Sequence, residues 1–165
     1  TTQSRHSRCM EGKDPLRIVI GNRQRRHPIE AKRIRNQALR TLSALGFTDS
    51  ELSVTFVGDR TMRRLNREYR GIDKSTNVLS FSMGEGDFAG VNPHLLGDVV
   101  ISVDTARREA DEEGISLSER IGFLLLHGIL HVTGHDHERS GDEEARRMER
   151  AQRKLFTLLK REGLL

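Results

Sequence analysis

The chain has 165 residues, which is enough for one domain with a buried core. Charged residues make up 32% of the sequence and apolar residues 35%, so the core must come from a few strongly apolar segments. The sequence contains no run of about 18 uncharged apolar residues and no secretory hydrophobic region, and it therefore predicts a soluble cytoplasmic protein rather than a membrane protein.

The N-terminal segment is polar and contains the only cysteine of the chain, Cys9. We expect residues 1–14 to be disordered and residues 15–165 to form a single domain. A lone cysteine has no partner for an internal disulfide, which agrees with a reducing compartment.

Apolar periodicity predicts an alternation of strands and helices along the rest of the chain. The expected strands are Leu16–Ile20, Leu52–Val57, Asn77–Ser82 and Leu96–Ser102. The expected helices begin at Pro28, Asp59, Asp104, Leu117 and Glu143. This order of elements predicts an α+β fold, in which a small mixed four-stranded sheet is covered by about five helices.

Three local features refine this prediction. Pro28 suits the first turn of the helix that follows the first strand. The next helix carries Met62, Leu65 and Tyr69 on one side. Residues 84–93 have turn composition, which predicts a mobile loop.

The charge of the chain is uneven. Residues 1–45 contain eleven basic and three acidic residues, a balance of +8, whereas the other 120 residues have a balance of −4. The basic residues near the end of the first strand and in the following helix are Arg23, Arg25, Arg26, Lys32, Arg33, Arg35 and Arg40. We interpret this region as a nucleic-acid interface, with Arg25, Arg26 and Arg33 as substrate-binding residues. The alternative interpretation is that these basic residues only form a charged surface exposed to solvent.

Aromatic residues argue against one mode of nucleic-acid binding. The chain has one tyrosine, six phenylalanines and no tryptophan. These are too few for an extended platform that stacks the bases of a single strand.

The most specific signal is the segment His127–His137, which reads HGILHVTGHDH. His127 and His131 are four residues apart and so share one face of a helix, and His137 returns toward them after a turn at Gly134. The apolar residues before the run predict a helix buried on nearly all sides, which holds the imidazoles rigidly. Three imidazoles leave one coordination position open, as in catalytic zinc sites, and they predict a metal centre at the end of this helix.

Three residues of this run qualify the prediction. His135 is an alternative to His137 as the third ligand, and Asp136 is either a residue that orients a ligand imidazole or a solvated turn residue. Gly128 stands where metalloproteases with a similar pattern carry the glutamate that acts as general base. Because glycine has no side chain to accept a proton, the run argues against a zinc peptidase.

Two further segments accompany the histidine run: residues 65–81, LNREYRGIDKSTNVLSF, and residues 96–101, LGDVVI. Together the three segments resemble the YbeY family of bacterial single-domain metal-dependent endoribonucleases. The family patterns are H-G-x-L-H-x-x-G-Y-D-H, L-N-x-x-Y-R-x-x-D-x-x-T-D-V-L-S-F and L-G-D-I-x-I, and the likeness extends from about Leu16 to the C-terminus. The chain departs from them at His135, where the family usually has tyrosine, and at Asn77, where it has aspartate.

The resemblance implies that His127, His131 and His137 bind one Zn²⁺ ion per chain and that His131 and Arg70 act in catalysis. It also implies a single-strand-specific endoribonuclease that matures the 3′ end of small-subunit ribosomal RNA and acts in ribosome quality control. The implied partners are ribosomal RNA, the ribosomal small subunit and assembly proteins. An arginine suits the role given to Arg70 because its planar guanidinium clamps a phosphate through two hydrogen bonds.

Three functional hypotheses follow. In the first, an RNA phosphodiester is hydrolysed with help from the metal, Arg70 positions the phosphate, and the attacking group is a water-derived hydroxide or the RNA 2′-hydroxyl. The second is a non-catalytic ribosome assembly module in which zinc braces the fold, and the third is a zinc peptidase. Three imidazoles also suit nickel, copper or iron, so the choice of zinc rests on chemistry and on the resemblance.

Overall fold

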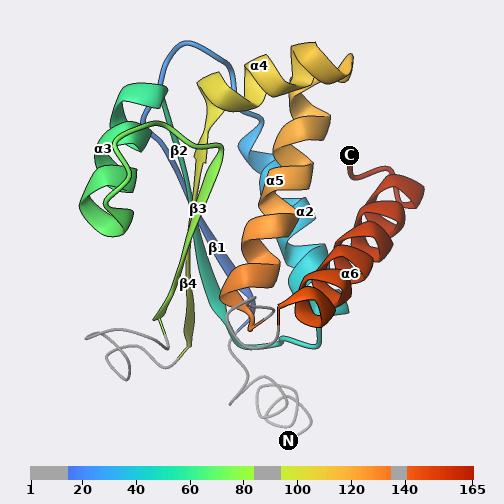
Figure 1. The fold of residues 1–165 in the computed structure, drawn as a ribbon. Coiled ribbons are helices and arrows are strands. Elements are labelled where there is room, and N and C mark those ends of the chain that lie inside the picture. Colours follow the sequence, from blue (N-terminus) through green and yellow to red (C-terminus); the bar gives the residue numbers. More distant parts are fainter. Residues whose placement is uncertain (1–14, 84–93, 135–140) are drawn as a thin grey trace, which may run out of the picture.

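The computed structural model describes residues 15–83, 94–134 and 141–165, which form one sheet and five helices (Figure 1). The strands are β1 (Arg17–Asn22), β2 (Glu51–Val57), β3 (Val78–Ser82) and β4 (Leu95–Ser102). The helices are α2 (Ala31–Ala44), α3 (Asp59–Arg70), α4 (Val103–Glu113), α5 (Leu117–Val132) and α6 (Asp142–Arg161). The expected α+β fold with a mixed four-stranded sheet is confirmed.

The strand order in the sheet is β1-β2-β4-β3. Strands β1, β2 and β4 are parallel, and β3 pairs with β4 in the antiparallel direction at one edge. We call the end of the sheet near Asn22 and Ser102 its carboxyl end and the end near Arg17 and Leu95 its amino end. Helix α5 runs from the carboxyl end to the amino end (Figure 1).

The two faces of the sheet are covered unequally. Helices α2, α5 and α6 lie on one side, whereas α3 lies on the other (Figure 1). In β2, Leu52, Val54 and Phe56 alternate toward the helix-rich side and are fully buried, while Ser53 and Thr55 face the side of α3. The buried residues between the sheet and α3 are Val57, Met62, Leu79 and Val100. The main core therefore lies between the sheet, α2 and α5.

Helix α5 is buried on nearly all sides, as the sequence predicts, because its apolar residues pack against both the sheet and α6. Ser116 caps its start: the side-chain oxygen accepts a hydrogen bond from the backbone N–H of Glu119 at 3.1 Å. No single helix in the described ranges is long and apolar enough to cross a membrane, and α4 and α5 reach that length and hydropathy only when counted together as a bent pair.

One local prediction about the helices is wrong. Helix α2 begins at Ala31 rather than at Pro28. The preceding segment is a loop because the Gln24 side chain accepts a hydrogen bond from the backbone N–H of His27 at 3.0 Å and donates one to its carbonyl oxygen at 2.7 Å. Tyr69, on the same side of α3 as Met62 and Leu65, is 65% exposed.

Two predictions concern residues outside the described part of the chain, namely disorder at residues 1–14 and a mobile loop at residues 84–93. The single-domain boundary at residue 15 stays a prediction.

Candidate functional site

His127 and His131 lie in the last two turns of α5, at the amino end of the sheet. Both side chains are half-buried. Their rings meet edge to face with centroids 4.6 Å apart, and their Nε2 atoms are 3.1 Å apart. The structure thus brings together two of the three predicted metal ligands.

Gln152 of α6 orients the ring of His127. Its amide nitrogen donates a hydrogen bond to the backbone carbonyl oxygen of Phe123 at 3.1 Å, which turns its oxygen toward Nδ1 of His127 at 3.0 Å. Because an amide oxygen only accepts hydrogen bonds, Nδ1 of His127 carries a proton, and in the neutral ring Nε2 keeps a lone pair. Partners of this kind fix the orientation of metal-ligating histidines.

Gln152 was not predicted from the sequence. It lies between Met148 and Leu155 on the buried face of α6. A polar side chain among the apolar positions of an amphipathic helix needs a hydrogen-bond partner. This placement of Gln152 is the sequence signal that could have identified it.

The geometry of the histidine pair fits a tetrahedral metal ion. Two nitrogens bound to one tetrahedral zinc ion at about 2.0–2.1 Å are roughly 3.3 Å apart, close to the 3.1 Å between the Nε2 atoms here. His137, the alternative ligand His135 and Asp136 lie outside the described residues. Within the described ranges, no three His, Cys, Asp or Glu side chains form a group able to hold a metal. The three-histidine centre therefore stays a prediction.

Gly128 faces the sheet rather than the histidine pair. A Cβ atom at this position would lie 2.5 Å from Cγ1 of Val99 and 3.3 Å from Oγ of Ser80, which is tighter than normal packing. The Ser80 hydroxyl also donates a hydrogen bond to the Gly128 carbonyl oxygen at 3.4 Å. The glycine lets α5 approach β3 and β4 closely, so the position that carries the glutamate in metalloproteases has no room for one here.

The side of the sheet that faces α3 carries a groove of about 850 Å³. Outward side chains of β2, β3 and β4 form its floor, and α3 forms one wall. Its lining includes Arg23, Arg64, Tyr69, Phe81 and Asp98. Ser80 also lines the groove, and it bonds to the chain neighbour of His127, so β3 lies between the groove and the histidine pair.

Arg70 is the last residue of α3 and is exposed. It forms no ion pair within the described ranges, whereas Arg63 and Arg67 of the same helix lie 2.9 and 3.9 Å from the Asp73 carboxylate. Helix α3 and the end of α5 lie on opposite sides of the sheet (Figure 1). The structure does not bring Arg70 into the histidine pair, and its catalytic role stays a prediction.

The predicted RNA-binding arginines lie at the carboxyl end of the sheet. Arg25 and Arg26 belong to the loop after β1, and Arg26 lies 3.8 Å from a carboxylate oxygen of α4. Arg33, in the first turn of α2, donates a hydrogen bond to the Ser118 hydroxyl at 3.1 Å. Ser118 is thirteen residues from His131 along α5, which corresponds to about 20 Å of helix. These arginines are therefore far from the histidine pair.

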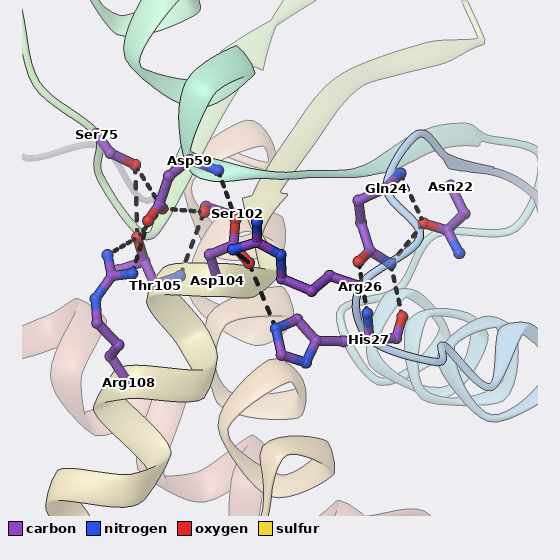
Figure 2. A network of polar contacts seen from close by, with 10 residues as sticks. All are labelled: Asn22, Gln24, Arg26, His27, Asp59, Ser75, Ser102, Asp104, Thr105 and Arg108. Carbon is purple, nitrogen blue, oxygen red and sulfur yellow. Dashed lines mark hydrogen bonds and ion pairs between the residues drawn. The ribbon is translucent and has the colours of Figure 1, made fainter.

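Asp59 is the centre of a polar network at the carboxyl ends of β2 and β4 (Figure 2). Its carboxylate accepts hydrogen bonds from the hydroxyls of Ser75 at 2.9 Å, Ser102 at 2.7 Å and Thr105 at 2.6 Å, and it pairs with Arg108 at 2.7 Å. Partial burial alone raises the pKa of Asp59, but hydrogen bonds from these four donors lower it well below its usual value. The network ties α3 to α4.

Asp104 extends this network to the loop after β1. Its Oδ2 atom accepts a hydrogen bond from the backbone N–H of Asp59 at 2.9 Å, and its Oδ1 atom lies 3.4 Å from Nε2 of His27 (Figure 2). The groups of the network satisfy one another, so we interpret it as structural.

We expect Asp59→Asn to change how stability depends on pH. Because the folded protein lowers the pKa of Asp59, this carboxylate stabilises the fold fully above its unfolded pKa of about 3.9 and loses that effect as the pH falls below it. The parent is therefore more stable than the variant near pH 7, and the difference shrinks as the pH falls through 4. Urea unfolding at several pH values measures this difference.

Asp73→Asn is the matched control, because Asp73 pairs with Arg63 on the surface. The stability difference between Asp73→Asn and the parent should change much less with pH, because solvent screens exposed ion pairs. An equal pH dependence for both variants would contradict the role assigned to the Asp59 network.

Asn77, one of the departures from the family pattern, has a structural role at the start of β3. Its side-chain oxygen accepts a hydrogen bond from the backbone N–H of Val78 at 2.7 Å, and its amide nitrogen donates to the Glu109 carboxylate at 3.2 and 3.3 Å. An aspartate here would place two like charges in contact. The neutral amide of Asn77 therefore suits a position beside the Glu109 carboxylate, where an aspartate would be repelled.

Comparisons with known proteins agree with the motifs. A family model described as Endoribonuclease YbeY matches residues 19–160. Relatives named Endoribonuclease YbeY include those of Geobacter metallireducens and Geobacter sulfurreducens, which are 60% and 58% identical over 91% of this chain and 100% of each relative. The Aquifex aeolicus relative is 47% identical over 78% of this chain and 82% of its own length.

A solution structure from Thermotoga maritima has a similar fold, with a TM-score of 0.55 at 21% identity, and the match covers 90% of this chain and 94% of that one. The family match spans most of the chain, including His127, His131 and Arg70. The chain belongs to the endoribonuclease YbeY family.

Proposed function

We propose that this chain is a metal-dependent endoribonuclease in which His127, His131 and His137 hold one zinc ion. The observation that carries the proposal is the His127–His131 pair, whose Nε2 atoms lie 3.1 Å apart while Gln152 engages the other nitrogen of His127. This is the arrangement that two ligands of one tetrahedral ion require.

When bound, zinc would supply Lewis-acid chemistry, either polarisation of a phosphoryl oxygen or a lower pKa of a water molecule. The protein residues then have separate tasks. Gln152 fixes the orientation of His127 through the 3.0 Å contact with Nδ1, and buried α5 keeps the ligand spacing rigid. Arg70 has no ion-pair partner among the described residues, and its guanidinium suits the binding of the scissile phosphate.

We further propose that the substrate is single-stranded ribosomal RNA, cut at the 3′ end of the small-subunit species, with the ribosomal small subunit and assembly proteins as partners in maturation and quality control. Arg33 contacts Ser118, which is about 20 Å of helix from His131, and Arg25 and Arg26 lie in the loop after β1 at the same carboxyl end of the sheet. Their proposed contacts are therefore with RNA remote from the cut bond, where they add affinity that depends on salt.

Metal removal tests this function. Purified protein should contain about one metal ion per chain by mass spectrometry, and it should cleave single-stranded ribosomal RNA fragments. A chelator should abolish cleavage, and zinc should restore it. Cleavage by protein that has lost its metal would contradict the proposal. RNA binding without cleavage in the presence of metal would favour the assembly module instead.

Arg70→Ala should keep the metal and lose most of the activity. Removing a donor that stabilises charge in the transition state lowers kcat by about 100- to 1,000-fold. The control is Arg67→Ala, because Arg67 lies on the same helix and contacts Asp73 instead. Equal activities of the two variants would contradict a catalytic role for Arg70.

A further inference from the structure

Tyr69 is an exposed aromatic residue held in place by another aromatic ring. It is 65% exposed, which is more than any other large apolar side chain in the described ranges. Its ring meets Phe81 edge to face, with centroids 5.1 Å apart and planes inclined by 63°. Tyr69 also lines the groove, so this braced ring is accessible to a ligand in it.

The aromatic pair lies beside the histidine end of the molecule. Phe81 is on the edge strand β3 opposite Asp98 of β4, and the next pair in the register is Ser82 with Gly97. Gly97 packs against α5, because a Cβ atom on it would lie 3.1 Å from Cγ1 of Val132. Val132 directly follows His131, so the aromatic pair and the histidine pair lie at the same level on opposite sides of β3.

The groove around the aromatic pair is suited to a polyanion. Arg23 and Arg64 line it, and neither forms an ion pair within the described ranges. Among the described residues that line the groove, Asp98 is the only carboxylate. Two free guanidinium groups attract phosphates, while Asp98 repels a phosphate from the floor beside Phe81. A strand in the groove is thereby oriented with a base, rather than a phosphate, toward the aromatic rings.

We propose that Tyr69, braced by Phe81, stacks one base of the single-stranded RNA substrate beside the cleavage site. The inference rests on the function proposed above and adds a specificity-determining residue to it. The composition of the chain excludes an extended stacking platform, but one exposed ring is enough for one unpaired base. A base held in a duplex is not free to stack in this way, so Tyr69 favours single strands.

The sequence provides a direct reporter, because Tyr69 is the only tyrosine and the chain has no tryptophan. All tyrosine emission therefore comes from this residue. We would titrate the full chain with a short single-stranded 2′-O-methyl oligoadenylate, confirm that it remains intact, and follow binding by the anisotropy of a label on the oligonucleotide. Tyrosine emission should fall in step with binding and reach a plateau.

Variants of Tyr69 and of the arginines separate the contribution of base stacking to binding from that of charge. Tyr69→Leu should weaken binding by about 5- to 150-fold, the effect of losing one stacked base, whereas Tyr69→Phe should retain binding within about twofold. An abasic oligonucleotide with the same phosphates should bind the parent as weakly as the oligoadenylate binds Tyr69→Leu. Arg64→Gln should weaken binding of both oligonucleotides, and Arg63→Gln, which removes the partner of Asp73 outside the groove, is its control.

Binding without a change in tyrosine emission would overturn the inference, as would equal affinities of Tyr69→Leu and the parent, or no binding at all. These results are distinct from failure of the proposed function. If RNA is cleaved but Tyr69 does not respond, only the stacking role is wrong. If Tyr69 responds but the metal-loaded protein does not cleave RNA, the groove binds RNA and the nuclease assignment is wrong.

Discussion

His131→Ala should remove both the metal and the RNA cleavage activity while the fold remains intact. The Nε2 atom of His131 lies 3.1 Å from that of His127, so its loss removes one of two ligands that the structure places together. Loss of an outer partner already lowers metal affinity by about 10- to 100-fold, and loss of a ligand should exceed this. Metal content, circular dichroism and cleavage of single-stranded RNA measured on the same preparation check this expectation.

His135→Tyr is the matched control, because it changes another histidine of the same run to the usual residue of the family. It should retain metal and activity. Loss of metal in this variant would make His135, rather than His137, the third ligand. Gln152→Leu should bind metal more strongly than His131→Ala and more weakly than His135→Tyr. Its metal affinity should fall by about 10- to 100-fold, because it removes the acceptor at 3.0 Å from Nδ1 of His127.

Gly128→Ala should destabilise the protein even though alanine is the better helix former. The added Cβ atom would lie 2.5 Å from Cγ1 of Val99, so α5 must move away from β4. Overpacking of this kind costs about 1–3 kcal/mol, against a gain of about 1 kcal/mol in helix propensity. Urea unfolding should show a net loss of stability, and a shift of α5 should weaken metal binding as well.

Gly122→Ala tests the same exchange on the same helix. There the added Cβ atom meets the far end of the flexible Leu165 side chain, which can move. This variant should be close to the parent in stability or above it. In the Gly128→Ala background, Val99→Ala should restore part of the lost stability, because it removes the methyl groups that clash. Equal effects of the two glycine variants would contradict the close approach at Gly128.

Elements fixed by local chemistry were predictable from the sequence. Helix α3 begins at Asp59 directly after one glycine and ends at Arg70. Gly71 follows it with a φ of 70°, in the left-handed region that glycine adopts without strain. The alternation of Leu52, Ser53 and Val54 predicted both the strand β2 and the face that is buried. Such signals depend only on the nearest residues in the chain.

Features that depend on tertiary contacts were not predictable. Gln152 lies on a different helix from His127, and only the packing of α6 against α5 joins them. Tyr69 lies on the same side of α3 as the buried Met62, but helical spacing alone does not reveal that it is 65% exposed. The start of α2 was misplaced because the side chain of Gln24 competes for the backbone of the segment that contains Pro28.

The same distinction applies to the histidine site. Helical spacing predicted that His127 and His131 share a face, and their Nε2 atoms meet at 3.1 Å. In the sequence, Gly128 means that the proton acceptor of metalloproteases is absent. The structure adds a steric reason, because a Cβ atom at this position would lie 2.5 Å from Cγ1 of Val99.

The partner of His127 also sets the charge balance of the site. A carboxylate at this position would place a negative charge beside the ligand and offset part of the charge of a bound dication, whereas the amide of Gln152 is neutral. If a zinc ion is bound as proposed, the neutral Gln152 amide would leave its positive charge less offset than a carboxylate would. Such a site would attract an anionic group such as a phosphodiester more strongly than an uncharged peptide bond.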